Sequence, residues 1–139
     1  MNKYLTFILG GQPYGVSISS VISIEKIAEI TAMPEQPNYV KGNINYSGII
    51  VPIIDLNLRL GKAETELTEY SSILVVNIDG ADVGFIIDAT GELIDIDDDK
   101  ISPPPSLSSD IGNRVIEGVS LVANNVVFLL NIETLISKI

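Results

Sequence analysis

The stretch Pro37-Asn-Tyr-Val-Lys-Gly-Asn-Ile-Asn-Tyr-Ser-Gly-Ile-Ile-Val-Pro-Ile-Ile-Asp55 decides the fold class. It predicts a strand, a tight turn at Ser47-Gly48 and a second, strongly apolar strand that ends in a carboxylate. Gly42 and Gly48 bracket the first strand, and Pro52 interrupts the second. A hairpin of this composition favours a chain built mainly from β-strands.

Apolar residues alternate with a period of two on both sides of this hairpin, as expected for strands. Turn signals such as Gly10-Gly11, Asp79-Gly80 and Asn124-Asn125 separate the runs. Short strands joined by such turns predict an all-β barrel or sandwich, and no repeat of fixed period is visible. Besides the hairpin, the strands are expected at residues 4–9, 14–18, 22–24, 72–78, 83–87, 93–96, 115–122 and 126–130.

Two short helical segments are expected where strands end. Residues 56–60 precede Gly61 and suit one helical turn with a glycine end. Asn131 suits the cap of a final helix at residues 132–137. The polar stretch 62–70 is the best candidate for a seam between two lobes.

The composition indicates a globular protein of acidic character. The chain has 139 residues, of which 46% are hydrophobic, with a net charge of −10 and a mean hydropathy of +0.38. This is enough apolar material for a packed core. The negative charge disfavours nucleic acid and anionic membrane surfaces as partners, whereas a basic patch on a protein remains compatible.

The residue types that are missing exclude several kinds of chemistry. The sequence has no Cys and no His, so disulfides, thiolate or histidine metal sites and a Ser-His-Asp triad cannot form. No phosphate-binding glycine loop of the Walker type occurs. Asp55 and Asp88 end apolar strands with no partner base, and we expect each to cap the following turn. We therefore predict no enzyme activity, no cofactor and no metal.

Two further segments allow alternative interpretations. The run Asp95 to Asp99 resembles half of a calcium loop, but Lys100 replaces the required glycine and Ser106 the required glutamate. A solvated loop is the favoured interpretation. Pro103 to Pro105 suit a stiff loop better than a polyproline ligand.

No signal peptide or membrane-spanning run is visible near the start of the sequence. The longest apolar run, Ile49 to Ile54, contains a proline and is far too short to cross a bilayer. The absence of Cys is compatible with a reducing compartment. We predict a soluble, cytoplasmic protein.

Several motifs, in one order from Tyr4 to Ile136, resemble the CheW family of chemotaxis coupling proteins. The family's opening strand is similar to Tyr4-Leu5-Thr6-Phe7, and its central hairpin to the stretch quoted at the start. A matching strand is Val83-Gly84-Phe85-Ile86-Ile87-Asp88. The end of the family pattern resembles Leu129-Leu130-Asn131-Ile132-Glu133-Thr134-Leu135-Ile136.

This resemblance implies a fold of two SH3-like five-stranded β-barrel subdomains that share an apolar core. We expect the first barrel at roughly residues 13–65 and the second at roughly 66–139, together with an N-terminal strand at 1–12. It further implies a non-enzymatic adaptor whose partners are a CheA-type histidine kinase regulatory domain and the hairpin tip of chemoreceptors. Self-association in rings and recruitment to receptor arrays at the inner face of the membrane would follow.

The resemblance also implies two partner surfaces. The kinase-binding residues would be Ile18, Ser23, Ile24 and Leu135. The receptor-binding residues would be Lys41, Gly42, Ser47, Ile50, Val83 and Gly84. For Ile18, Ile50 and Leu135, a place in the core is an equally good interpretation, and the glycines also suit positions of positive φ or close backbone approach.

Three positions depart from the family pattern. Ser23 stands where the family usually has Glu, Ser47 where it usually has Arg, and Asn57 where a further Arg is usual. Because both members of a close charged pair would be replaced together, neither charge is left without its partner. The alternatives are a coupling protein of a non-chemotaxis chemosensory pathway with altered partner choice or, further from the family, a small ligand-binding barrel or enzyme.

Overall fold

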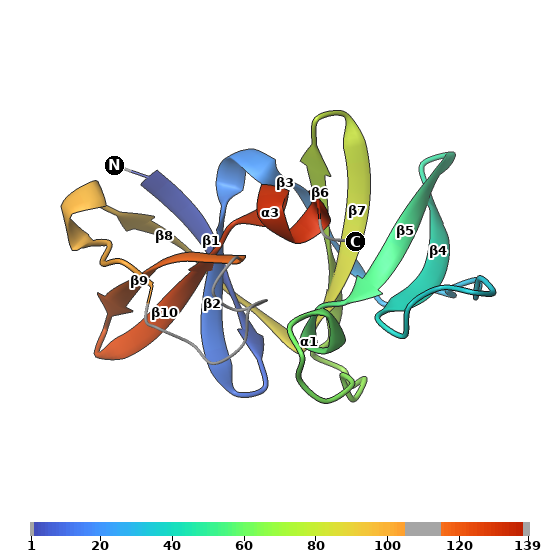
Figure 1. Cartoon of the computed structure of the whole chain (residues 1–139), viewed down its shortest axis with the longest axis horizontal. Coiled ribbons are helices and arrows are strands. Elements are labelled where there is room, and N and C mark those ends of the chain that lie inside the picture. The colour runs from blue at the N-terminus through green and yellow to red at the C-terminus, as the bar shows by residue number, and fades with distance from the viewer. Residues whose placement is uncertain (1, 105–114, 138–139) are drawn as a thin grey trace. The chain divides into compact units, whose positions relative to one another are not determined.

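The computed structural model describes residues 2–104 and 115–137, and it is composed almost entirely of β-strands. The chain divides into two units. We call Val21–Thr90 the central unit and Met1–Ser20 with Gly91–Ile139 the terminal unit. Each contains one five-stranded sheet of the SH3-like kind (Figure 1), which confirms the predicted fold class.

The central unit has the sheet order β3-β6-β7-β5-β4. Its core cluster consists of six buried aliphatic side chains: Ile44, Val51, Ile53, Ile73, Val75 and Ile86. Strands β6 and β7 are buried along both faces, so they do not form an exposed apolar groove. The elements are β3 (Val21–Lys26), β4 (Val40–Tyr46), β5 (Ile49–Asp55), α1 (Leu56–Arg59), β6 (Ser72–Ile78) and β7 (Ala81–Ile87).

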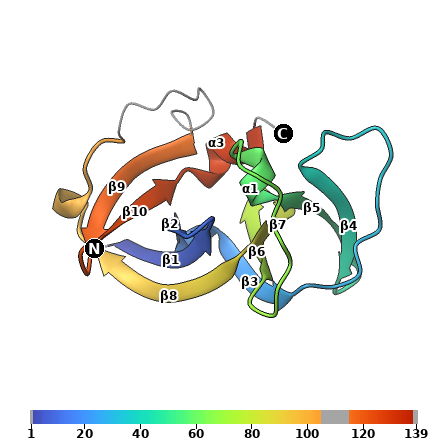
Figure 2. The same cartoon turned by 90° about the horizontal axis from the view of Figure 1, so that it is seen from below.

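The terminal unit has the sheet order β8-β1-β2-β10-β9. Tyr4, Ile96, Val127 and Leu129 form its core cluster. The elements are β1 (Asn2–Leu9), β2 (Gln12–Ser17), the 3-10 turn η1 (Ile18–Ser20), β8 (Ala89–Ile96), the 3-10 turn η2 (Asp98–Lys100), β9 (Ile116–Val122), β10 (Asn125–Leu130) and α3 (Ile132–Ser137) (Figure 2).

The predicted central hairpin is confirmed as β4 and β5. Ser47 and Gly48 form its turn with φ values of 50° and 80°, as a two-residue turn that matches the twist of the strands requires. Two details differ from expectation. Gly42 lies inside β4, at a register shift, and Pro52 is paired with Asn43 without interrupting β5. Pro52 is tolerated because that position does not have to donate a ladder hydrogen bond.

The expected boundaries of the two subdomains differ from the observed units. Strand β2 lies beside β10, with Tyr14 opposite Phe128 in a parallel pair. The first hairpin therefore belongs with the last one, and not with residues up to 65. The polar stretch 62–70 is no seam, because side chains of the central unit bind it. One boundary falls after η1 and the other within β8, where composition gives no signal.

Other local predictions hold with small shifts. The turn Asp79-Gly80 is confirmed, whereas the turn between β9 and β10 is Ala123-Asn124, one residue earlier than expected. Ile18 begins η1 and does not extend a strand. Part of the predicted loop with Pro105 and Ser106 lies outside the described residues.

Both sheets are built to one plan, although the sequence shows no fixed repeat. Each has an antiparallel hairpin, β4–β5 or β9–β10, whose second strand runs parallel to a neighbour, β7 or β2. Each hairpin contains one register shift and is followed by a helix.

Candidate partner-binding surfaces

The edge strand β3 presents isoleucines to solvent. Ile22 and Ile24 are 43% and 40% exposed, whereas Ser23 between them turns inward. Its hydroxyl oxygen is buried and has no hydrogen-bond partner among the described residues. Because alternate side chains of a strand point to opposite faces, β3 offers an apolar outer row. Ile18, in the terminal unit, is 36% exposed.

The tip of the β4–β5 hairpin presents a second apolar surface. Ile50 is 73% exposed and Ile49 is 53% exposed. The adjacent turn Ser47-Gly48 is held by a hydrogen bond in which the Gly48 N–H donates to Asn45 Oδ1 at 2.9 Å. Ser47 is exposed in this turn and has no role in the core. A large apolar side chain exposed at the start of β5, next to a hydrogen-bonded turn, is a good candidate for a contact with another protein.

The two predicted receptor-binding glycines are sites of close approach. A Cβ atom at Gly42 would lie 2.0 Å from the backbone oxygen of Thr31. One at Gly84 would lie 2.6 Å from Ile53 Cδ1. Val83 is buried at 6% exposure. Gly42, Gly84 and Val83 are therefore packed inside the central unit and can only support a receptor-binding surface, whereas Ile50 is exposed to a partner.

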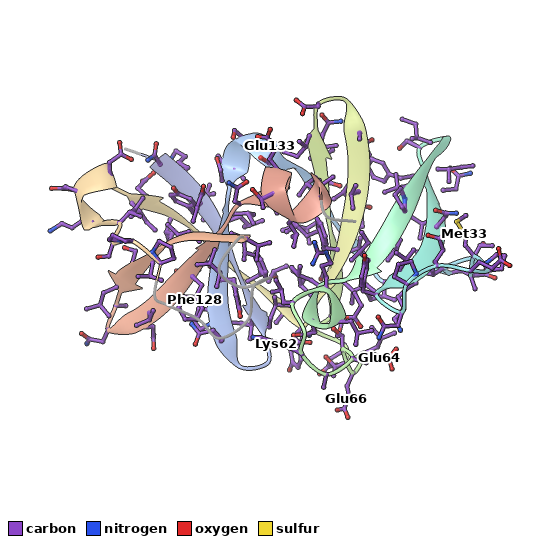
Figure 3. All side chains as sticks on the ribbon, in the orientation of Figure 1. Met33, Lys62, Glu64, Glu66, Phe128 and Glu133 are labelled. Carbon is purple, nitrogen blue, oxygen red and sulfur yellow. The ribbon has the colours of Figure 1, made fainter. Side chains whose placement is uncertain are left out.

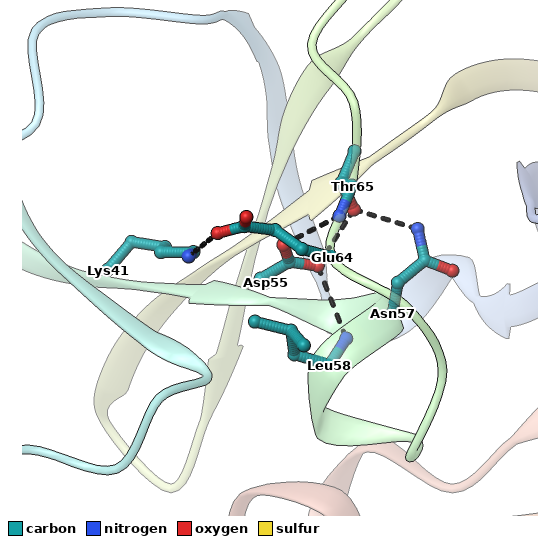
Figure 4. Close-up of polar contacts among 6 residues, drawn as sticks. All are labelled: Lys41, Asp55, Asn57, Leu58, Glu64 and Thr65. Carbon is teal, nitrogen blue, oxygen red and sulfur yellow. Dashed lines mark hydrogen bonds and ion pairs between the residues drawn. The ribbon is translucent and has the colours of Figure 1, made fainter.

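Lys41 belongs to a polar network that fastens the stretch 62–70 to the central unit (Figure 4). Its ammonium pairs with Glu64, which projects from this stretch near Glu66 (Figures 3 and 4). The next residue, Thr65, donates to the buried Asp55 carboxylate from its hydroxyl at 2.7 Å and from its backbone at 3.0 Å. The pattern of the sequence did not reveal Glu64 and Thr65, because a run of polar residues resembles a free linker.

Asp55 also caps α1, as predicted, because it accepts from the Leu58 N–H at 3.3 Å. Asp88 accepts instead from the side chain of Asn57, at 3.2 Å. Asn57 donates to Thr65 as well, at 2.7 Å, so this departure from the family pattern serves the network. Both carboxylates are thus held by hydrogen-bond donors, as structural groups commonly are.

The final helix α3 begins as expected. The Thr134 N–H donates to Asn131 Oδ1 at 3.0 Å, which is the predicted cap. Leu135 on this helix is fully buried, at 0% exposure. The interpretation as core therefore holds for Leu135, whereas Ile50 is not a core residue.

Carboxylates of the terminal unit interact with nearby polar groups. Asp95 forms an ion pair with Lys3 at 3.2 Å, and Asp98 accepts from Asn2. Across residues 2–104 and 115–137, no group of three acidic side chains could hold a metal ion. Partial desolvation raises the pKa of the Glu117 carboxyl, although the residue as a whole is exposed on β9. Burial first, and the charges of Glu117 and Asp98 next, raise the pKa of Tyr4.

In the described part of the chain, no helix is long and apolar enough to span a membrane. Two SH3-like units, the central one with isoleucines exposed on an edge strand and on a hairpin tip, define the class as a β-rich protein of the adaptor kind. The comparisons with known proteins agree with this class.

The model of the CheW-like domain family matches residues 3–139. The chain is 34% identical to a probable chemotaxis protein CheW of Rhizobium etli, over 98% of this chain and 88% of that protein. It is 32% identical to the chemotaxis protein CheW of Helicobacter pylori, over 98% and 82% of the two chains. The crystal structure of the scaffolding protein TtCheW from Thermoanaerobacter tengcongensis superimposes with a TM-score of 0.87 at 34% identity, covering 94% and 88% of the two chains.

The chain belongs to the CheW-like family, a family of chemotaxis scaffold proteins.

Proposed function

We propose that this protein couples methyl-accepting chemoreceptors to a CheA-type histidine kinase and has no catalytic activity of its own. The observation that carries the proposal is the exposure of Ile24 and Ile50 on a chain of this family. Two separate apolar surfaces suit a scaffold with two partners. The site of action would be cytoplasmic, at receptor arrays, where many weak contacts add up and where rings could form.

The kinase-binding residues would be Ile24 on the central unit and Ile18 on the terminal unit, with Ser23 on the inner side of β3 and Leu135 as a buried support of α3. Ile24 is the best single probe because its side chain is exposed on an edge strand. The receptor surface would contain Lys41, Gly42, Ser47, Ile50, Val83 and Gly84. In that surface Ile50 would supply the contact, while Gly42, Gly84 and Val83 fix the backbone below it.

Calorimetric titration with the regulatory domain of a CheA-type kinase from the same genome tests the first partner. We expect binding in the micromolar range, about −8 kcal/mol. Ile24→Asp should abolish it, since a carboxylate would be buried without a partner. Leu121→Asp is the matched control, because Leu121 is also an exposed strand residue, in the terminal unit, and it should leave the affinity unchanged.

The second partner has its own test. Ile50→Asp should weaken binding to a receptor signalling hairpin and leave the kinase affinity unchanged. Circular dichroism and thermal melting must show that both variants fold. If neither partner binds the unaltered chain, or if Ile24→Asp and Leu121→Asp behave alike, the proposal is wrong.

A second function is favoured by Ser23, whose hydroxyl is buried without a partner among the described residues. The chain could serve a chemosensory pathway other than chemotaxis, with Ser23 and Ser47 replaced as a unit to alter partner choice. A double-mutant cycle with Ser23→Glu and Ser47→Arg measures their coupling. We expect the double variant to lose less binding free energy for the kinase domain than the sum of the losses of the two single variants. Strict additivity of these losses would contradict the idea.

A further inference from the structure

A polar pocket lies at the outer edge of β4, entirely within the central unit. Its volume is about 500 Å³, which is within the range of about 300–1,000 Å³ typical of ligand sites. Two segments supply the lining, one that follows β3 and one from the β4–β5 hairpin. The lining residues are Glu29, Thr31, Asn43, Ile44, Asn45 and Ile50.

The outer edge of β4 is paired at Asn43 and open at Asn45, beside this pocket. Thr31 exchanges both backbone hydrogen bonds with Asn43, each at 2.9 Å. Because N–H and C=O groups of alternate residues in an antiparallel strand point to the same edge, those of Asn45 also point outward. Glu29 would be the next residue to pair there, but among the described residues the bridge at Asn43 is the last on this edge.

The chemistry of the lining favours a cation. Glu29 brings a carboxylate, and Thr31 and Asn43 bring oxygen atoms that accept hydrogen bonds. None of the six lining residues is basic. Ile44 and Ile50 add an apolar wall, against which the aliphatic stem of a long side chain can pack. A planar guanidinium with five donors suits several acceptors better than a compact ammonium.

We propose that this pocket binds an arginine side chain of a partner protein, carried on an extended segment that pairs with the outward N–H and C=O groups of Asn45 in β4. Strand addition to a sheet edge, with a pocket for an alternate side chain, is a general mode of peptide recognition. The proposal goes beyond coupling to a receptor and a kinase. Ile50 lines the pocket and also belongs to the proposed receptor surface, but Glu29, Thr31 and Asn45 belong to neither surface proposed above. A change at Glu29 therefore tests the pocket without altering the residues on which the proposed coupling depends.

The test is an NMR titration of the ¹⁵N-labelled full chain with a blocked peptide, Thr-Val-Thr-Arg-Thr-Val-Thr. We expect saturable shifts of the amides of Glu29, Thr31 and Asn45. The same peptide with citrulline in place of arginine keeps the shape and loses the charge, and it should bind about tenfold more weakly. A peptide with an N-methyl group at every backbone nitrogen cannot donate to a neighbouring strand from either edge, and it should not bind.

Glu29→Gln should weaken binding of the arginine peptide about tenfold. Glu66→Gln is the matched control, because Glu66 is an exposed residue of the stretch 62–70 and the net charge changes equally. Absence of saturable shifts at these amides, or equal binding by Glu29→Gln, would overturn the proposal. Full binding of the methylated peptide would refute strand pairing. Shifts that appear when the chain alone is concentrated would mean that a second copy fills the pocket, which also overturns it.

Discussion

In the central unit the β4–β5 hairpin places Asn45 opposite Ile50, and in the terminal unit the β9–β10 hairpin places Leu121 opposite Val126. These positions correspond residue by residue, because every pair of the second hairpin lies 76 positions after its counterpart in the first. The extra residue at the register shift is Lys41 in one hairpin and Glu117 in the other.

The difference between the hairpins lies in what the same backbone displays. The central hairpin has an acceptor-rich pocket beside an exposed isoleucine and a lysine paired with Glu64. Its counterpart has an acidic residue with a raised pKa at the place of the lysine. The two hairpins have the same strand pairing but different side chains. Partner choice can therefore change at this hairpin without a change of fold.

The largest effect should come from the glycine at the register shift. Gly42→Ala would force a Cβ to 2.0 Å from a backbone oxygen at φ 139°, whereas Gly118→Ala meets Ile101 Cγ2 first, at 2.7 Å. We expect the free energy of unfolding to fall by about 3 kcal/mol or more in Gly42→Ala. The fall should be clearly smaller in Gly118→Ala, because the side chain of Ile101 can move aside. Urea unfolding of the two variants measures this. Equal losses would show that the two shifts are under the same constraint.

The second-largest effect should be the difference in stability lost when the caps of α1 and α3 are removed. Asn131→Ala removes the cap bond to Thr134, at a cost of about 1 kcal/mol. Asp55→Ala removes the cap and both bonds from Thr65, and we expect about 2–3 kcal/mol. Hydrogen exchange should show that residues 62–70 loosen only in the Asp55 variant. Protection of this stretch in both variants would mean that contacts other than those of Asp55, such as the Lys41–Glu64 ion pair and the bond from Asn57 to Thr65, are enough to fasten it.

The smallest effect concerns pH. The raised pKa of Glu117 means that the folded state binds a proton more readily than the unfolded one, so this group favours folding at pH below its ordinary value and loses that contribution as the pH rises through the folded pKa. Glu117→Gln should therefore increase the melting temperature at pH 7 but not at pH 3.5. Glu66→Gln is the control. An increase of equal size at both pH values would contradict this explanation.

Local signals in the sequence predicted local structure well. Ser47-Gly48 and Asp79-Gly80 specify turns by their backbone preferences, and Asp55 and Asn131 specify caps, because these effects depend on neighbours in sequence. The division into units depends on the parallel pairing of β2 with β10, which joins distant segments without any local mark. The duplicated plan is not apparent from the sequence because several corresponding residues, such as Asn45 and Leu121 or Pro52 and Phe128, share a place in the sheet but differ in side-chain chemistry.

The candidate surfaces were predictable only in part. Family resemblance pointed to Ile24 and Ile50, and both are exposed. It also pointed to Leu135, but the burial of a helical leucine depends on packing that a pattern of residues does not fix. For Gly42, no pattern of residues distinguishes room for a partner from room for Thr31, because the approaching segment lies eleven residues away on the other side of a loop.

The way the chain enters and leaves the two units has a consequence for its synthesis. The central unit is one continuous segment, so all its strands have left the ribosome once residue 90 has emerged. Strands β1 and β2 are made before the central unit, but β9 and β10, which complete their sheet, are made after it. During that interval the edge of β2 that later pairs with β10 is unpaired. This unpaired strand edge is a site where a chaperone could bind.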